Sequence, residues 1–194
     1  MLSYEKHNIT LLYKSGTDFS STADEGLTLV TSPISCLNEA MEKPYDLIVI
    51  CFDLASLRES DALVELCTAL KKNRYTRQIP LLVILPFKHR KLLESLRDAG
   101  VEYVKFYDLK ELDSKSRVKT LVTPPAKECG IGRVLSEICP YINYSPIGRH
   151  QEILFCGAYL NRMVIATYRL KHYCETYNYE NCEYFKNPKF SNQT

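Results

Sequence analysis

The chain has 194 residues, 45% of them hydrophobic and 25% charged, so it is long enough and apolar enough to bury a core without disulfide or metal staples. Its formal net charge of +2 is too small to indicate binding to nucleic acid or to an acidic membrane surface. The opening MLSYEKHN lacks the pattern of a signal peptide, and the longest apolar run is far shorter than a membrane span. We therefore expect a cytoplasmic protein.

Eight cysteines are many for such a protein, and in a reducing compartment they indicate thiols or metal ligands rather than disulfides. Three are scattered among apolar neighbours, and five lie in the last third of the chain: Cys129, Cys139, Cys156, Cys174 and Cys182. Tyrosines also become more frequent after residue 140. These changes predict two parts, residues 1–140 and 141–194. The boundary is expected at 140–150, where two prolines and a glycine interrupt any regular pattern.

The first segments of the chain alternate between β-favouring and helical patterns. Strands are expected at 9–13 and 27–31, separated by the polar residues 17–25, which indicate a loop or a short helix. Ser32-Pro33 then combines an N-cap with proline at the first helical position, so a helix should follow and end before Pro44. Its apolar face is expected to comprise Leu37, Ala40 and Met41.

Two continuous apolar runs, 46–52 (DLIVICF) and 80–86 (PLLVILP), have the composition of central strands that are covered on both faces. Between them, Ser60-Asp61 is expected to cap a helix that packs through Leu63, Leu66, Cys67 and Leu70. Strands and helices that alternate at this spacing predict a parallel sheet.

The remainder of the first part continues the alternation. A helix is expected at 88–99 with Gly100 at its C-cap, followed by a fifth strand at 101–107. Residues 108–125 are polar and indicate an insertion, and a last helix should pack through Ile131, Val134, Leu135 and Ile138. The predicted fold class is therefore α/β: a doubly wound, parallel five-stranded sheet with a small cysteine-rich C-terminal module.

Three segments of this pattern resemble the receiver domains of response regulators: 45–50 (YDLIVI), 79–84 (IPLLVI) and 99–105 (AGVEYVK). The resemblance covers about residues 7–140 and is strongest over 44–106. It implies a CheY-like, flavodoxin-like sheet whose carboxyl edge once carried phosphorylation chemistry.

Most of the residues that this chemistry needs are absent. By the resemblance, Cys51 stands at the phosphoacceptor position, Leu85 at the switch hydroxyl position, and Lys14 follows the strand where acidic magnesium ligands are expected. Only Lys105 matches the family pattern, and Asp53 should face away from the pocket. The resemblance therefore predicts a pseudo-receiver that does not accept phosphate.

Cys51 itself allows two interpretations. It is either a redox-sensing thiol whose pKa is lowered by Lys105, or a small apolar residue at the end of a strand, and we favour the second. Cys36 and Cys67 lie on apolar helix faces and are predicted to be core residues.

The tail carries the candidate site. Its spacing is C-x17-C-x7-C, through Cys156, Cys174 and Cys182, in a segment too polar to fold by burial alone. C-x2-C pairs, typical of zinc ribbons, are absent, and widely spaced cysteines favour an iron–sulfur cluster, with 4Fe-4S as the expected type and zinc as the alternative. The motif also resembles small cysteine motifs appended to regulatory proteins.

A fourth ligand is less evident. Cys139, followed by Pro140, is chosen because it should end the last helix and face the tail, whereas Cys129 should lie about 15 Å away along that helix. His172 remains a further candidate. Residues 152–173 contain two β-favouring runs, which predict a hairpin around residues 160–162, with a helix as the alternative for the second run. The tyrosines of the tail, at 159, 168, 173, 177, 179 and 184, are expected either to shield a cluster or to bind a partner.

The leading hypothesis is a non-enzymatic regulatory or adaptor protein, in which a pseudo-receiver is coupled to a cluster that acts as redox sensor or structural element. The alternative is an iron–sulfur electron-transfer accessory protein of a redox enzyme complex. A third hypothesis is a thiol sensor at Cys51 with structural zinc in the tail. We expect a protein partner, with a homodimer as one option, and no nucleic acid or membrane.

Overall fold

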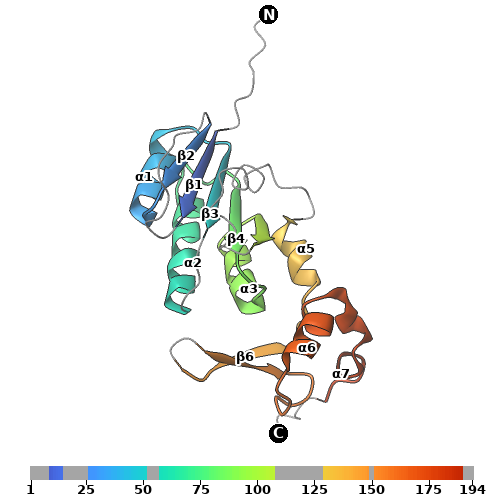
Figure 1. Ribbon diagram of the computed structural model, residues 1–194. Coiled ribbons are helices and arrows are strands. Elements are labelled where there is room, and N and C mark those ends of the chain that lie inside the picture. Colours follow the sequence, from blue (N-terminus) through green and yellow to red (C-terminus); the bar gives the residue numbers. More distant parts are fainter. Residues whose placement is uncertain (1–8, 15–25, 52–56, 108–128, 149–150, 190–194) are drawn as a thin grey trace, which may run out of the picture.

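The structure is a computed structural model that describes residues 9–14, 26–51, 57–107, 129–148 and 151–189. Its centre is a parallel five-stranded sheet with strand order β2-β1-β3-β4-β5 (Figure 1). This order is that of the flavodoxin-like fold, so the α/β prediction is confirmed at that level. The strands are β1 (Thr10–Lys14), β2 (Leu27–Val30), β3 (Leu47–Cys51), β4 (Leu81–Leu85) and β5 (Tyr103–Phe106).

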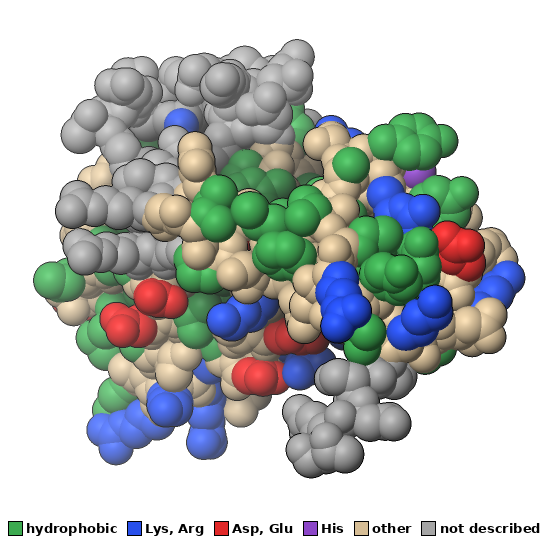
Figure 2. Space-filling model, turned by 90° about the horizontal axis from the view of Figure 1, so that it is seen from below, with side chains coloured by type: hydrophobic (Ala, Val, Ile, Leu, Met, Phe, Trp, Pro, Cys, Tyr) green, Lys and Arg blue, Asp and Glu red, His purple; other side chains and the backbone are tan. Residues whose placement is uncertain are grey.

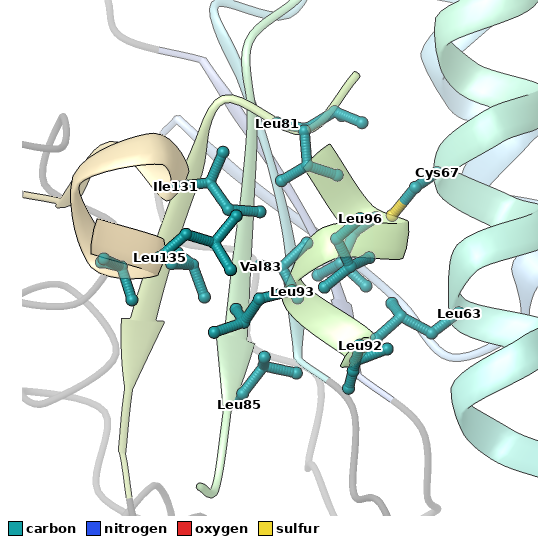
Figure 3. Packing of buried hydrophobic residues seen from close by; sticks show 14 of the residues in the cluster. Leu63, Cys67, Leu81, Val83, Leu85, Leu92, Leu93, Leu96, Ile131 and Leu135 are labelled. Carbon is teal, nitrogen blue, oxygen red and sulfur yellow. The ribbon is translucent and has the colours of Figure 1, made fainter. Parts of the chain in front are cut away.

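The main helices pack on one face of this sheet. They are α1 (Pro33–Glu42), α2 (Leu57–Lys72), α3 (Arg90–Asp98) and α5 (Ile131–Ser136), and their apolar side chains join those of one sheet face in a single hydrophobic cluster. Figure 3 shows α3 inserted between α2 and α5 above β4, with Leu93 and Leu96 completely buried. The core faces predicted for the segments that form α2 and α5 are thereby confirmed.

The opposite face of the sheet is also buried. Leu12, Val49, Leu82 and Ile84 are at most 2% exposed, as expected for strands covered on both sides. Helices on this second face, which a doubly wound fold requires, do not occur among the residues that the structure describes. The polar segments expected at 17–25 and 108–125 lie outside those residues, as does Asp53.

Local signals explain where α1 and α3 begin and end. The Ser32 side chain accepts a hydrogen bond of 3.1 Å from the amide of Ser35, and Pro33 opens α1, as predicted. Gly100 follows α3 with φ of +92°, a conformation that glycine adopts without strain.

Two helix predictions are wrong in detail. Ser60 and Asp61 lie inside α2, which begins at Leu57, so the capping pattern there is coincidental. In α1, Met41 was expected on the core face but is 39% exposed, whereas Cys36 and Ala40 are buried as predicted.

The C-terminal part begins with an antiparallel hairpin of β6 (Ile142–Pro146) and β7 (Glu152–Cys156). The expectation of irregular chain at 140–150 is therefore wrong for 142–146. Pro146 is tolerated because it ends β6, an edge strand of this two-stranded sheet, where its missing N–H disrupts little.

After β7 the chain reverses through Leu160 and Asn161, both with positive φ. Met163 and Ile165 then bond back to β7, through Cys156 N–H to Met163 O (2.9 Å) and Ile165 N–H to Leu154 O (2.8 Å). The chain thus turns back on β7 at 160–162, as the expected hairpin requires, and it becomes helical from Thr167, which was the alternative for the second run. The helical segments are α6 (Thr167–Arg169), the π-helix η3 (Leu170–Cys174), the 3₁₀ helix η4 (Tyr177–Asn181) and α7 (Glu183–Lys186).

The C-terminal part does not pack independently of the α/β part. The cluster on the helix-covered face continues through Ile138, Ile142 and Ile165 to the cysteines of the tail. A separate cysteine-rich module therefore stays a prediction. No helix among the described residues is both long and apolar enough to cross a membrane.

Candidate functional site

Cys51, the last residue of β3, lies in the core of the sheet. Cys51 is 1% exposed, and burial raises the pKa of its thiol to about 12, although the positive charge of Lys14 opposes this rise. In the sheet register Cys51 pairs with Lys14 on one side, whereas Ile84 separates it from Lys105. Lys105 is therefore not the neighbour that activates this thiol. A buried, protonated thiol is a poor nucleophile and a poor redox sensor.

The four cysteines selected from the sequence lie around one cavity. Cys139, Cys156, Cys174 and Cys182 all contribute to its wall, and the first three are less than 10% exposed. The cavity volume is about 10 Å³, roughly enough for one water molecule. These residues come from four different segments that are up to 43 residues apart, so the tertiary fold brings them together.

Each of these cysteines is fixed by its backbone. Cys139 follows α5 by three residues rather than ending it, and its amide donates to the carbonyl oxygen of Cys174 (2.7 Å). Cys156 ends β7 and accepts from Tyr159 and Asn161 in the following turn. Cys182 caps α7 and donates to Tyr179 O (2.9 Å).

Aromatic and aliphatic side chains complete the wall. Tyr141 and Tyr179 pack on Phe185 at ring-centroid distances of 5.7 and 4.9 Å, and Tyr184 packs on Tyr159 at 4.9 Å. The remaining apolar contributors are Ile142, Ala158, Met163 and Ile165. Of the tyrosines expected to shield a site, Tyr173, Tyr179 and Tyr184 line the cavity. Tyr168 and Tyr177 are exposed instead.

The thiols influence one another electrostatically. Burial, together with the neighbouring thiols of Cys139, Cys182 and Cys156, raises the pKa of Cys174 to about 12. Burial likewise raises the pKa of Cys139 and of Cys156. The cavity therefore keeps the thiols of Cys139, Cys156 and Cys174 protonated unless a cation compensates the charge of the thiolates.

Other candidate ligands lie elsewhere. Cys129 and His172 do not line the cavity; His172 is exposed, stacks on Tyr168, and places Nδ1 2.9 Å from the Tyr168 carbonyl oxygen. The helix proposed to separate Cys129 from Cys139 covers only Ile131–Ser136. Among the described residues, no three His, Cys, Asp or Glu side chains form a group that could hold a single metal ion.

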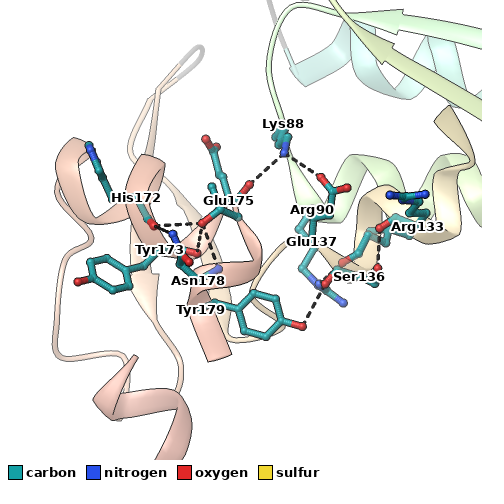
Figure 4. Close-up of polar contacts among 12 residues, drawn as sticks. Lys88, Arg90, Arg133, Ser136, Glu137, His172, Tyr173, Glu175, Asn178 and Tyr179 are labelled. Carbon is teal, nitrogen blue, oxygen red and sulfur yellow. Dashed lines mark hydrogen bonds and ion pairs between the residues drawn. The ribbon is translucent and has the colours of Figure 1, made fainter. Parts of the chain in front are cut away.

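Polar contacts tie this site to the start of α3, as Figure 4 shows. Lys88 donates to the carbonyl oxygen of Glu175 (3.0 Å), the residue after Cys174, and pairs with Glu137 (3.4 Å). Tyr179, from the cavity wall, donates its hydroxyl to Ser136 O (3.1 Å) at the end of α5. The Arg90 guanidinium donates to the carbonyl oxygens of Leu135 and Ile138, immediately before Cys139.

The hairpin is attached to the same point of α3. His89 Nδ1 accepts from the amide of Leu92 and so caps the helix, while Nε2 lies 3.0 Å from Glu152 in β7. The Tyr144 ring of β6 stacks on His89 at 3.9 Å. Sequence analysis did not identify these attachments, nor Tyr141 and Phe185. The only available signal for Phe185 was its position three residues after Cys182.

Neither a protein-family model nor a curated protein matches this chain. Function is therefore inferred from the site itself.

Proposed function

We propose that this chain is a non-enzymatic regulatory or adaptor protein in which Cys139, Cys156, Cys174 and Cys182 hold an iron–sulfur cluster beside a pseudo-receiver domain. The observation that carries the proposal is the shared cavity: four thiols, widely spaced in sequence, line one enclosed apolar space. Thiolates are the ligands of such clusters, and four of them match the 4Fe-4S type.

The wall of the cavity fits that role. Its aromatic and aliphatic side chains exclude water, which protects a cluster and strengthens electrostatic interactions with it. A cluster distributes its ligands around a cage of iron and sulfide, so the four thiols need not meet at one point. When bound, the cluster would supply a one-electron redox centre and a cross-link between the four segments.

The small volume of the cavity predicts that the protein changes shape when it binds a cluster. A space of about 10 Å³ admits a cluster only if the segments that carry Cys174 and Cys182 move outward. Cys174 is the last residue of the π-helix η3, a form that occurs frequently at functional sites, and Cys182 is the N-cap of the four-residue helix α7. The backbone contacts of Lys88 and Tyr179 would carry that movement to α3 and α5.

This connection is what supports a regulatory role. Lys88 and Arg90 follow β4 at the edge of the sheet where receivers, by resemblance, change conformation. By resemblance, Cys51 and Leu85 stand at the phosphoacceptor and switch positions, and both are buried. A thiol at the phosphoacceptor position does not accept phosphate, so in this proposal binding of the cluster, instead of phosphorylation, is the signal that the domain receives. The exposed side chains of Val164, Tyr168 and Tyr177 give the tail an apolar surface for a protein partner.

Metal analysis of the full chain, expressed and purified without oxygen, tests the proposal. We expect brown protein with iron and sulfide in equal amounts, about four of each per chain, and broad visible absorbance. Colourless protein with one zinc per chain would indicate a structural zinc in place of the cluster. Protein without metal after anaerobic reconstitution would refute the proposed function.

A further inference from the structure

One charged side chain lies in the cavity wall beside the four cysteines. Arg169, in α6, is the only lysine, arginine, aspartate or glutamate among the described residues that line it. Its guanidinium Nη1 lies 3.8 Å from the Sγ of Cys182, a distance and geometry that meet the criteria for an N–H···S hydrogen bond. The wall thus combines four potential anions with one permanent cation.

Two further contacts hold this guanidinium in place. Its central carbon lies 5.2 Å from the centre of the Tyr184 ring, and Nη2 lies 3.9 Å from Oε1 of Glu183. Tyr184 also forms part of the wall, so the ring fixes the cation beside the sulfur instead of letting it extend into solvent. Glu183 is 69% exposed and its carboxylate therefore compensates the charge only weakly.

The guanidinium of Arg169 would lie beside the ligand sulfur of Cys182 when a cluster is bound. Four thiolates around a cluster carry net negative charge, and one-electron reduction, with the electron supplied by an electrode or dithionite, makes that charge more negative by one. A cation with an N–H donor at a ligand sulfur stabilises the reduced form more than the oxidised form. Its removal should therefore make the midpoint potential more negative.

We infer that Arg169 is a positioning residue for the cluster: it donates an N–H···S hydrogen bond to the Cys182 sulfur and sets the reduction potential of the site. This inference rests on the proposed function. A purely structural role, in which Arg169 only joins α6 to Tyr184, would leave the potential of the assembled site unchanged.

The test compares three variants of the full chain after anaerobic reconstitution: Arg169→Gln, Arg169→Lys and, as matched control, Arg162→Gln. Arg162 is exposed, does not line the cavity and carries the same charge. Midpoint potentials are measured by spectroelectrochemical titration, at low and at high salt. Figure 2 shows the end of the molecule that holds the hairpin and the tail, where several exposed lysines and arginines lie; high salt suppresses their contribution.

We expect Arg169→Gln to shift the potential clearly to more negative values, Arg169→Lys to shift it by a smaller amount, and Arg162→Gln to leave it near the wild-type value at high salt. Lysine retains the charge but cannot reproduce the planar fork of donors that stacks on Tyr184. If Arg169→Gln does not assemble a cluster, the midpoint potentials of the other two variants decide. A more negative potential in Arg169→Lys than in Arg162→Gln supports the inference, and equal potentials in both variants and wild type overturn it.

The role of Arg169 would be overturned, with the cluster still in place, by two results together. Arg169→Lys would have the same midpoint potential as wild type, and Arg169→Gln would shift the potential no more than Arg162→Gln does. A zinc-containing wild-type protein with no redox response would instead refute the proposed function, and this inference with it.

Discussion

The contact between Arg90 and the end of α5 should be a principal attachment of the cysteine site to the α/β part. The Arg90 guanidinium donates to the carbonyl oxygens of Leu135 and Ile138, and its Nε pairs with Glu94 at 2.8 Å. Leu135 lies in the last turn of α5 and Ile138 lies two residues after its end, a place where a positive charge is favourable. The change Arg90→Ala removes all three interactions but keeps the backbone bond from Arg90 N–H to the hydroxyl of Tyr144.

The expected loss of stability in Arg90→Ala follows from how deeply the Arg90 side chain is buried. A hydrogen bond from a charged donor contributes about 1.5–3 kcal/mol when buried, and the Arg90 side chain is 19% exposed, so most of that value applies. The pair with Glu94 adds about 0.3–0.5 kcal/mol. Allowing for water that reaches the freed carbonyls, we expect Arg90→Ala to lower the free energy of unfolding by about 2–3 kcal/mol. Arg90→Lys, a point charge that cannot bridge both carbonyls, should lose about half of this.

Urea unfolding of the metal-free full chain, followed by far-UV circular dichroism because the chain has no tryptophan, measures the effect. The matched control is Arg97→Ala on the same helix, whose side chain is 51% exposed and pairs with Asp98. It should cost less than about 0.5 kcal/mol. Equal losses for Arg90→Ala and Arg97→Ala would mean that the guanidinium does not hold α5 against α3.

Three further predictions concern the two cysteine sites. Magnesium with beryllofluoride should cause no chemical-shift changes around Cys51, because a thiol replaces the carboxylate and Lys14 is its neighbour in the sheet; magnesium-dependent shifts there would contradict the pseudo-receiver interpretation. Cys51 should resist alkylation by iodoacetamide at pH 8 in folded protein, since its thiol is 1% exposed and has a pKa of about 12, and mass spectrometry of a rapidly modified Cys51 would disprove the sealed pocket. Cys174→Ser and Cys182→Ser should each release the metal and make residues 150–194 sensitive to protease while β1 to β5 stay folded, and full metal content in both variants would exclude these ligands.

The sheet could be predicted because its signals are local. The runs at β3 and β4 are apolar at every position, which only a strand buried on both faces requires, and Ser32-Pro33 marks the start of α1 by its own chemistry. The exposure of Met41 in α1 was harder to predict, because this residue is apolar and its burial depends on how the helix meets the sheet.

The tail could be predicted less well, because its structure depends on distant contacts. Four cysteines were identified by residue type, yet the segments between them fold as a π-helix and 3₁₀ turns that have no clear periodicity. Arg169 was not recognised: in the sequence it is one basic residue among Lys171 and His172, and only the fold places it at Cys182. Pro146 was interpreted as a breaker because its edge position could not be known.

The central claim, that one site is built from Cys139 together with three cysteines of the tail, is tested most directly by comparing Cys139→Ser with Cys129→Ser. Both variants remove one thiol from the region around α5, but only Cys139 lines the cavity and bonds to the backbone of Cys174. Iron and sulfide content per chain, with visible absorbance after anaerobic reconstitution, is the measurement. The account predicts loss of the cluster in Cys139→Ser and full retention in Cys129→Ser; retention in Cys139→Ser with loss in Cys129→Ser would contradict it.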